Sequence, residues 1–294
     1  MRRAEALALL DDLDRTEPFP GAARIGLTGA PGVGKSTLID AMVRTLRARG
    51  DSVAIAAVDP SSHKSGGALL GDRIRMRAGS TDAGVFIRSM AARDRLGGLA
   101  EATYAAVSIM GAVFDYVFVE TVGIGQSEGD VAGLVDTLVF VANPGAGDTL
   151  QFMKAGILER PDIFVVNKSD IGALAERAAS ELSSGLGLAE REQGERERPV
   201  LLTSARDAVG VAELVDALDS HRAAFASSGE LEKHRHNGRE AYVLAALERR
   251  YGSFGVEQLG GAKAVRERLS RSPARSPFGQ VAHLGREIEL ALGK

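Results

Sequence analysis

Residues 29–37 read Gly-Ala-Pro-Gly-Val-Gly-Lys-Ser-Thr. The stretch fits the pattern Gly-x-x-x-x-Gly-Lys-Ser/Thr, whose glycines let backbone N–H groups turn inward and approach a phosphate closely. Lys35 is placed to reach the β- and γ-phosphates of a nucleoside triphosphate, and the hydroxyl of Ser36 is placed to bind Mg²⁺. The predicted phosphate-binding residues are Gly29, Ala30, Pro31, Gly32, Val33, Gly34, Lys35, Ser36 and Thr37.

The sequence on both sides of this loop has the pattern that the motif requires. Residues 24–28 read as a short buried strand that enters the loop, and residues 38–49 carry apolar side chains at helical spacing. A helix that begins near Gly34 adds the positive end of its dipole beneath the phosphates. A glycine-rich turn without a ligand is the alternative, but the four fixed positions together with these flanks favour a nucleotide-binding protein.

The composition excludes several classes of protein. The chain has 294 residues, a net charge of −3 and no cysteine, so disulfides and thiolate metal sites are excluded, and a dedicated nucleic-acid surface is not expected. No apolar run is long enough to cross a membrane. The first residues resemble a signal peptide, but acids at positions 11, 12 and 14 follow the apolar part, which favours an amphipathic helix. We expect a soluble cytoplasmic protein that contacts neither nucleic acid nor membrane.

Apolar runs recur along the chain in the alternation typical of an α/β fold. The sequence predicts a P-loop NTPase, or G-domain, with a mostly parallel central sheet flanked by helices. Residues 186–198 are charged and lack periodicity, which predicts a surface excursion. Further strands are predicted at 52–58, 85–88, 116–119, 137–143, 163–166 and 199–203, and helices at 97–112, 150–158 and 210–224.

Acidic residues follow two of the predicted strands at their carboxyl ends, where ligands of open α/β sheets bind. Glu120 ends the strand 116–119, at the place where P-loop proteins carry the acid of the Mg²⁺ shell, and the backbone N–H of Gly123 is positioned for the γ-phosphate. Asp59 ends the strand 52–58 and is predicted to position the attacking water or a Mg²⁺-bound water. Asp72 is expected to bind Mg²⁺ directly or through water. The predicted catalytic residues are Lys35, Asp59, Asp72 and Glu120, and the predicted metal ligands are Ser36, Asp59, Asp72 and Glu120.

Residues 167–170 read Asn-Lys-Ser-Asp and fit the guanine-reading pattern Asn-Lys-x-Asp. The carboxylate of Asp170 is suited to accept two parallel hydrogen bonds, from N1–H and the exocyclic amino group of guanine. Adenine offers no such donor pair, so it would leave the carboxylate unpaired. After the last strand, the backbone N–H of Ala205 is positioned for the guanine carbonyl. The predicted base-side residues are Asn167, Lys168, Asp170, Ser204, Ala205 and Arg206.

The amide that orients the attacking water in Ras-like enzymes is missing from its expected position. Such enzymes carry a glutamine four residues after the Mg²⁺ acid, and here that place is Ile124, with Gln126 two residues further along. We therefore expect slow intrinsic turnover that a partner or dimerisation completes. The arginine that neutralises the transition state is left open among Arg73, Arg75, Arg88 and a partner's arginine; a solvated helix face is the other interpretation of the basic segment.

Strand patterns end near residue 226. Helical stretches follow at 229–251, 261–270 and 279–292, with a proline-containing break between the last two. His234 and His236 fall on different helix faces, so a metal pair is not expected. The predicted division is an N-terminal helix or arm (1–20), a GTPase domain (21–225) and a C-terminal helical region (226–294) for dimerisation or partner contact.

The stretches between the generic motifs carry a family resemblance. Together with the loop at 29–37 and the segment 167–170, the stretches 58–62, 66–76, 120–128 and 144–151 are similar to those of the methylmalonyl-CoA mutase-associated GTPases. The resemblance covers residues 24–215. It implies a G-domain of the signal-recognition and nickel-insertion class, with GTP or GDP and Mg²⁺ as ligands.

The same resemblance implies a function and a partner. Such proteins are chaperones that gate loading and repair of adenosylcobalamin in an acyl-CoA mutase, usually as homodimers. The loop that matches residues 144–154 transmits the nucleotide state to the mutase, which makes Gln151 and Lys154 candidate coupling residues.

The sequence gives less support to two other functions. A nickel-insertion GTPase is expected to carry a Cys- or His-rich ligand set, whereas this chain has no cysteine and five scattered histidines. A transport-linked ATPase or kinase of the lysine/arginine/ornithine system, an older label of some relatives, would require adenine recognition, which Asp170 opposes.

Overall fold

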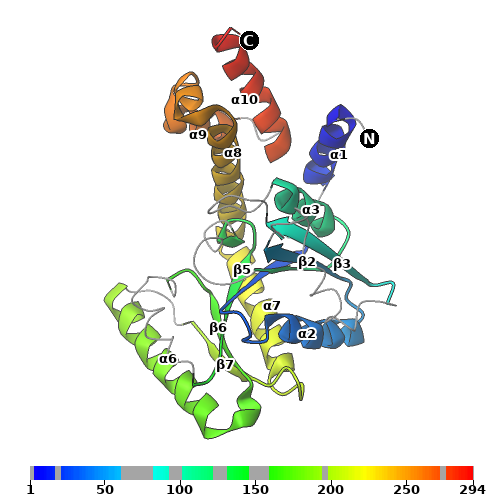
Figure 1. Cartoon of the computed structure of the whole chain (residues 1–294), viewed down its shortest axis with the longest axis vertical. Coiled ribbons are helices and arrows are strands. Elements are labelled where there is room, and N and C mark those ends of the chain that lie inside the picture. Colours follow the sequence, from blue (N-terminus) through cyan, green and yellow to red (C-terminus); the bar gives the residue numbers. More distant parts are fainter. Residues whose placement is uncertain are drawn as a thin grey trace.

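The computed structural model describes residues 3–16, 21–60, 82–92, 101–121, 131–145, 159–193, 198–271 and 276–293. These residues form one parallel seven-stranded sheet with the order β3-β2-β4-β1-β5-β6-β7 (Figure 1). Every strand lies where the sequence predicted one, so the predicted fold class is confirmed. The strands are β1 (Ala23–Thr28), β2 (Val53–Pro60), β3 (Val85–Ala92), β4 (Tyr116–Glu120), β5 (Thr137–Ala142), β6 (Ile163–Asn167) and β7 (Val200–Thr203).

The central strands are buried on both faces. β1, β4, β5 and β6 have no exposed residue, which explains their continuous apolar character, because helices cover a parallel sheet on both sides. Alternate residues of one strand therefore enter different cores. Phe118 joins the core on one face, and its neighbours Val117 and Val119 join the core on the other.

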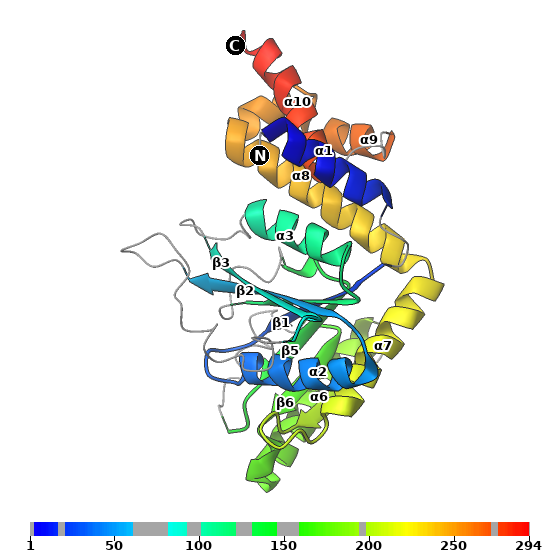
Figure 2. The ribbon, with the colours of Figure 1, turned by 90° about the vertical axis from the view of Figure 1, so that its right-hand side faces the viewer.

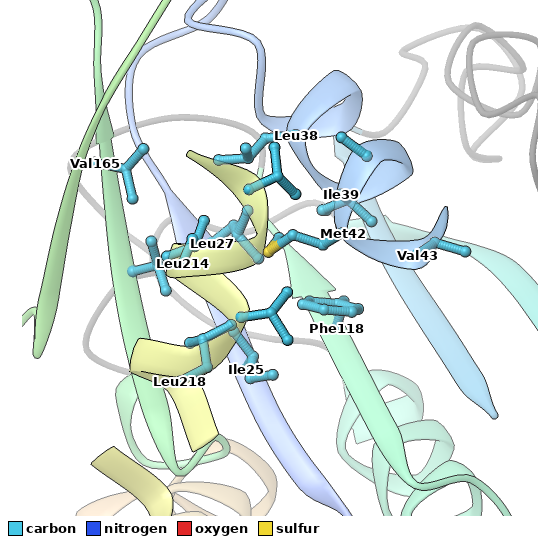
Figure 3. Packing of buried hydrophobic residues seen from close by; sticks show 14 of the residues in the cluster. Ile25, Leu27, Leu38, Ile39, Met42, Val43, Phe118, Val165, Leu214 and Leu218 are labelled. Atoms are coloured by element: carbon cyan, nitrogen blue, oxygen red, sulfur yellow. The ribbon is translucent and has the colours of Figure 1, made fainter. Parts of the chain in front are cut away.

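Helices α2 (Lys35–Arg49) and α7 (Val211–Ser227) cover the first face. In Figure 3, Leu38 and Met42 of α2 pack with Leu214 and Leu218 of α7 over Ile25, Leu27 and Phe118 of the sheet. Burying one such side chain contributes about 1.5–3 kcal/mol. This packing fixes the start of α2, and with it the loop that connects β1 to α2.

The opposite face is covered by α3 (Glu101–Gly111) and α6 (Ala173–Gln193). Figure 2 shows α2 and α3 on opposite sides of the sheet. The helix α6 corrects the prediction of a surface excursion at 186–198, because its described part continues to Gln193. Leu182 and Leu186 are buried one helical turn apart. The charged composition concealed this apolar pair.

The C-terminal region is helical as predicted, with α8 (Glu230–Glu257), α9 (Gly261–Arg271) and α10 (Pro277–Ala291) around an apolar cluster of their own. The N-terminal helix α1 (Arg3–Thr16) contacts α10 and α3. Tyr104 of α3 stacks on Tyr242 of α8, and Phe278 of α10 contacts both rings edge-on, with ring centroids 4.1–5.7 Å apart. The C-terminal helices therefore share a core with the sheet, and the division at residue 226 stays a prediction.

Two of the predicted elements are only partly described or not described. The helix predicted at 97–112 is seen from Glu101 onward, and the helix predicted at 150–158 lies outside the described residues. Within the described part of the chain, no helix has both the length and the apolar character needed to span a membrane.

Candidate nucleotide-binding site

The loop between β1 and α2 has a backbone that only glycine supports at two positions. Gly29 has φ 144° and Gly34 has φ 98°. A Cβ atom on Gly29 would lie 2.2 Å from the carbonyl oxygen of Val141, and one on Gly34 would lie 2.5 Å from Nδ2 of Asn167. The positive φ angle and the lack of space for a Cβ atom therefore both favour glycine at these two positions. The result is a compact cradle at the N-terminus of α2, where the helix dipole favours an anion.

Lys35 is held on the inner side of this cradle. Its ammonium group donates to the carbonyl oxygens of Gly29 at 2.7 Å and Ala30 at 3.2 Å, and the residue is only 6% exposed. No acidic residue lies in the first turn of α2. A cation and the amino end of a helix therefore lie together at the point where the sequence predicted phosphate binding.

Ser36 and Glu120 meet beside the cradle. The hydroxyl of Ser36 donates to Oε1 of Glu120 at 2.6 Å. Glu120 ends β4, which pairs with β1 through the register Leu27 to Glu120, and it is buried. A hydroxyl and a carboxylate oxygen are hard donors of the kind that Mg²⁺ prefers. The donor set of these two residues therefore fits Mg²⁺.

Asn167 ties three segments together. Its Nδ2 donates to the carbonyl oxygen of Val33 at 2.9 Å, and its Oδ1 accepts from the N–H of Ala205 at 3.1 Å and the hydroxyl of Thr203 at 3.2 Å. Lys168, in the left-handed conformation with φ 62°, donates to the carbonyl oxygen of Gly32 at 2.9 Å. The segment 167–170 and the cradle are therefore hydrogen-bonded to each other directly.

Asp170 lies in the same network. Its Oδ1 accepts from the hydroxyl of Ser204 at 2.9 Å, and its Oδ2 pairs with Nη2 of Arg206 at 3.1 Å. The structure thus brings together three of the residues predicted for the base side. The N–H of Ala205 donates to Asn167 in this structure, so its contact to a guanine carbonyl stays a prediction. The role of Thr203 was not foreseen, because only its position beside Asn167 on the neighbouring strand reveals it.

Several predicted residues fall outside the described part of the chain. These are Asp72, Gly123, Ile124, Gln126, Gln151, Lys154, Arg73 and Arg75, together with the side chain of Asp59. Their roles stay predictions. Arg88 is described and exposed. It lies on the edge strand β3, separated from β1 by β2 and β4, which is roughly 14 Å at the usual strand spacing.

The histidines of α8 have separate partners. Nε2 of His234 lies 3.0 Å from the carbonyl oxygen of Ala132 and 2.9 Å from that of Val135. Nε2 of His236 lies 3.1 Å from Glu240 on its own helix. The two rings therefore do not converge.

Residues 1–251 match the family model described as methylmalonyl-CoA mutase-associated GTPase MeaB. The chain belongs to this family. As a MeaB-family protein it is a P-loop GTPase, and the family is associated with methylmalonyl-CoA mutase.

Individual relatives agree with this assignment. A protein of Pyrococcus abyssi named as a GTPase is 48% identical over 223 residues, which is 74% of this chain and 68% of its own. The mouse (Mus musculus) mitochondrial methylmalonic aciduria type A homolog is 37% identical over 295 residues, or 99% of this chain and 70% of its own. The crystal structure of an LAO/AO transport system kinase superposes with a TM-score of 0.61 at 26% identity, and covers 96% of this chain and 86% of its own.

Proposed function

We propose that this chain binds GTP together with Mg²⁺, hydrolyses it slowly to GDP, and acts as a chaperone that gates cobalamin loading and protection of an acyl-CoA mutase. One observation carries the nucleotide part. Asn167 and Lys168 donate to the carbonyl oxygens of Val33 and Gly32. These bonds hold the candidate phosphate loop and the candidate base-reading segment side by side, as a nucleotide that contacts both would require.

The proposal that the loop binds phosphate rests on Lys35 and the start of α2. In the described structure the Lys35 ammonium satisfies carbonyl groups of its own loop. Phosphate oxygens are stronger, charged acceptors, so Lys35 can exchange those carbonyls for the β- and γ-phosphates with a short movement. The backbone N–H groups of the first helical turn have no intrahelical partners and are suited to the same anion.

The proposal that Mg²⁺ binds beside the loop rests on Ser36 and Glu120, whose side-chain oxygens lie 2.6 Å apart. Bound there, Mg²⁺ would supply positive charge to the β- and γ-phosphate oxygens. Asp59 and Asp72 complete the proposed ligand set, with Asp59 also positioning water and Gly123 donating its N–H to the γ-phosphate. The proposal that the base is guanine rests on Asp170, whose carboxylate would accept hydrogen bonds from N1–H and the amino group of guanine.

The mutase part has different support. The matching family is described by its association with methylmalonyl-CoA mutase, and the mouse relative bears a methylmalonic aciduria name. We propose a cobalamin-dependent acyl-CoA mutase as partner, the loop 144–154 with Gln151 and Lys154 as its coupling element, and a homodimer formed through the region 226–294.

The alternatives receive less support. The transport-kinase name of the superposing structure would require a protein that accepts adenine, which the carboxylate of Asp170 opposes. A nickel-insertion GTPase would require soft ligands, and this chain has no cysteine.

Equilibrium binding tests the nucleotide part. Mg²⁺-GTP should bind at least about 100-fold more tightly than Mg²⁺-ATP, because adenine leaves the Asp170 carboxylate unpaired. Asp170→Asn should lower the affinity for GTP and raise the affinity for xanthosine triphosphate, since the amide of asparagine both donates and accepts hydrogen bonds. Asp216→Asn, an exposed acid of α7 paired with Arg49, is the matched control and should change neither. Equal affinity of the wild type for GTP and ATP would refute the assignment.

Turnover measurements test the partner. A cobalamin-dependent acyl-CoA mutase should co-elute with the chain and raise its rate of GTP hydrolysis by roughly 10-fold or more, as expected when a partner completes an active site. Absence of both effects, with GTP binding intact, would reject the mutase and leave the nucleotide assignment in place.

A further inference from the structure

Asp207 belongs to none of the nucleotide-binding motifs, yet it contacts the same two side chains that contact Asp170. Its Oδ2 accepts from the hydroxyl of Ser204 at 2.9 Å. Nε of Arg206 donates to its Oδ1 at 3.1 Å, and Nη2 donates to its Oδ2 at 3.2 Å. Among the described residues, Asp207 is therefore linked to the Asp170 carboxylate through the guanidinium of Arg206, which both carboxylates share, and through the hydroxyl of Ser204, whose single proton can be donated to only one of them at a time.

The backbone holds Asp207 in this position. Ser204 and Val209 exchange two hydrogen bonds, at 2.9 and 3.2 Å, which close the turn 204–209. Within the turn, the N–H of Asp207 donates to the Ser204 hydroxyl at 3.3 Å. Gly210 follows with φ 71°, where a Cβ atom would lie 2.1 Å from the carbonyl oxygen of Leu202. The backbone of this turn can therefore adopt few other conformations, which keeps the exposed Asp207 carboxylate in its position.

Asp207 and Arg206 each stabilise the charged form of the other. The hydrogen bond from Arg206 lowers the pKa of the Asp207 carboxyl below its ordinary value, and the bond from Ser204 lowers it further. The hydrogen bond to Asp207 is also the largest contribution that raises the pKa of Arg206. Both groups are therefore ionised at neutral pH, and the guanidinium is shared between Asp207 and Asp170.

The acceptor capacity of Asp170 explains why such sharing matters. An ionised carboxylate offers about four lone-pair positions, two on each oxygen. Among the described residues, Arg206 uses one on Oδ2, and Ser204 uses one on Oδ1 when its single proton points to Asp170 and not to Asp207. One position remains on each oxygen, which is the number that the two parallel donors of guanine need. A guanidinium turned fully onto Asp170 would take both oxygens in a bidentate pair and compete with the base.

We propose that Asp207 is a positioning residue for guanine selectivity, which holds Arg206 and Ser204 so that the Asp170 carboxylate keeps one acceptor position on each oxygen for the base. This inference rests on the proposed function, namely that Asp170 reads guanine. Asp207 acts only through its neighbours and touches no nucleotide.

Asp207→Ala is the informative variant. Among the described residues, Arg206 then keeps Asp170 as its acidic partner and turns onto it, so the affinity for Mg²⁺-GTP should fall about 5- to 10-fold, the scale of one ordinary hydrogen bond. The affinity for Mg²⁺-ATP and for inorganic triphosphate should stay unchanged, because neither uses Asp170. The KM for GTP should rise by the same factor, while kcat at saturating GTP should change less than about twofold.

Two further variants separate this role from a general effect. In an Arg206→Ala background, Asp207→Ala should change GTP affinity less than about twofold, because no guanidinium is left to compete. Asp216→Ala removes another exposed carboxylate, on α7, that pairs with Arg49 of α2, and it should leave the GTP-to-ATP ratio unchanged. Asp207→Asn keeps the shape of the side chain and should lie between wild type and Asp207→Ala.

The experiment is a titration of each variant with Mg²⁺-GTP, Mg²⁺-ATP and inorganic triphosphate. A selective loss of GTP affinity that disappears without Arg206 supports the inference. A wild type that prefers GTP, with the same GTP-to-ATP ratio in Asp207→Ala, overturns it. So does an equal loss for all three ligands, which would indicate a disturbed fold. If the wild type itself does not prefer GTP to ATP, the proposed function fails and this inference fails with it.

Discussion

The two ends of the sheet carry similar polar side chains and use them differently. At the amino ends, Asp136 accepts from the N–H of Arg24 at 3.0 Å and from two nitrogens of Arg235 at 2.7 and 2.8 Å, and its side chain is only 2% exposed. At the carboxyl ends, Asp170 accepts one bond on each oxygen and is 22% exposed. The first carboxylate is enclosed by protein donors, whereas the second keeps acceptor capacity near the surface.

The difference separates attachment from recognition. Arg235 belongs to α8 and also donates to the carbonyl oxygen of Ala22, just before β1, so this ion pair anchors the C-terminal helices to the strand that leads into the phosphate loop. Changes at the amino ends should therefore alter stability with little effect on binding. Changes at the carboxyl ends should alter nucleotide binding with little effect on stability.

The largest effect is expected from Arg235→Ala. The variant leaves the carboxylate of Asp136 buried without its cation, which costs about 3–5 kcal/mol. The free energy of unfolding from urea titration should fall by that amount, while the folded protein keeps its GTP affinity within about twofold. Arg268→Ala breaks an exposed pair with Glu287 and should cost no more than about 1 kcal/mol. Equal losses in the two variants would contradict the comparison.

Lys35→Ala tests the opposite end. The variant removes the cation of the phosphate cradle, so the affinity for Mg²⁺-GTP measured by calorimetry should fall about 100-fold or more. Its free energy of unfolding should change by less than about 1.5 kcal/mol, since hydrogen bonds such as those to the loop carbonyls of Gly29 and Ala30 contribute modestly to stability. Arg44→Ala, an exposed cation on the same helix, should bind GTP normally. Retained tight binding in Lys35→Ala would remove the phosphate role.

Gly238→Ala tests how closely α8 lies against the sheet domain. A Cβ atom there would lie 1.9 Å from the carbonyl oxygen of Gly133, so the helix must move away. The expected loss is about 2 kcal/mol in the free energy of unfolding. Gly187→Ala is the matched control, because nothing lies within 4 Å of its added Cβ in α6, and it should gain about 0.5–1 kcal/mol. A neutral Gly238→Ala would show that this contact is loose.

The smallest effect is expected at the turn that presents Asp207. Ala208 has φ 57°, a conformation that costs a residue with a side chain about 1–2 kcal/mol more than glycine. Ala208→Gly relieves this cost and loses part of the gain to the greater entropy of the unfolded chain, so we expect a net stabilisation of about 0.5 kcal/mol. Ala223→Gly, in the exposed part of α7, should instead lose about 1 kcal/mol. Urea titration distinguishes the two signs.

The centre of the sheet could be predicted from the sequence because β1, β4, β5 and β6 are buried on both faces, so that β5, for example, is apolar without a break from residue 138 to 142. The phosphate loop and the segment 167–170 could be located because their chemistry is local. The tie between them could not, since Asn167 and Val33 are 134 residues apart. The pairing of Arg235 with Asp136 spans 99 residues, and a charged residue on a helix ordinarily indicates a solvated face.

The helix α6 was missed for another reason. Its apolar stripe is narrow, and the many charged residues beside it weakened the helical period. Asp207 was also missed, because its importance depends on the turn that places it between Ser204 and Arg206, and no local pattern marks that arrangement.

The aromatic contacts among Tyr104, Tyr242 and Phe278 have a consequence for the order in which the molecule is assembled. During synthesis the strands and α3 leave the ribosome long before Tyr242 and Phe278 do, so α3 can cover its face of the sheet while the ring of Tyr104 still lacks both aromatic neighbours. The nascent chain therefore passes through a stage in which Tyr104 of α3 is exposed, and the arrival of α8 and then of α10 conceals it.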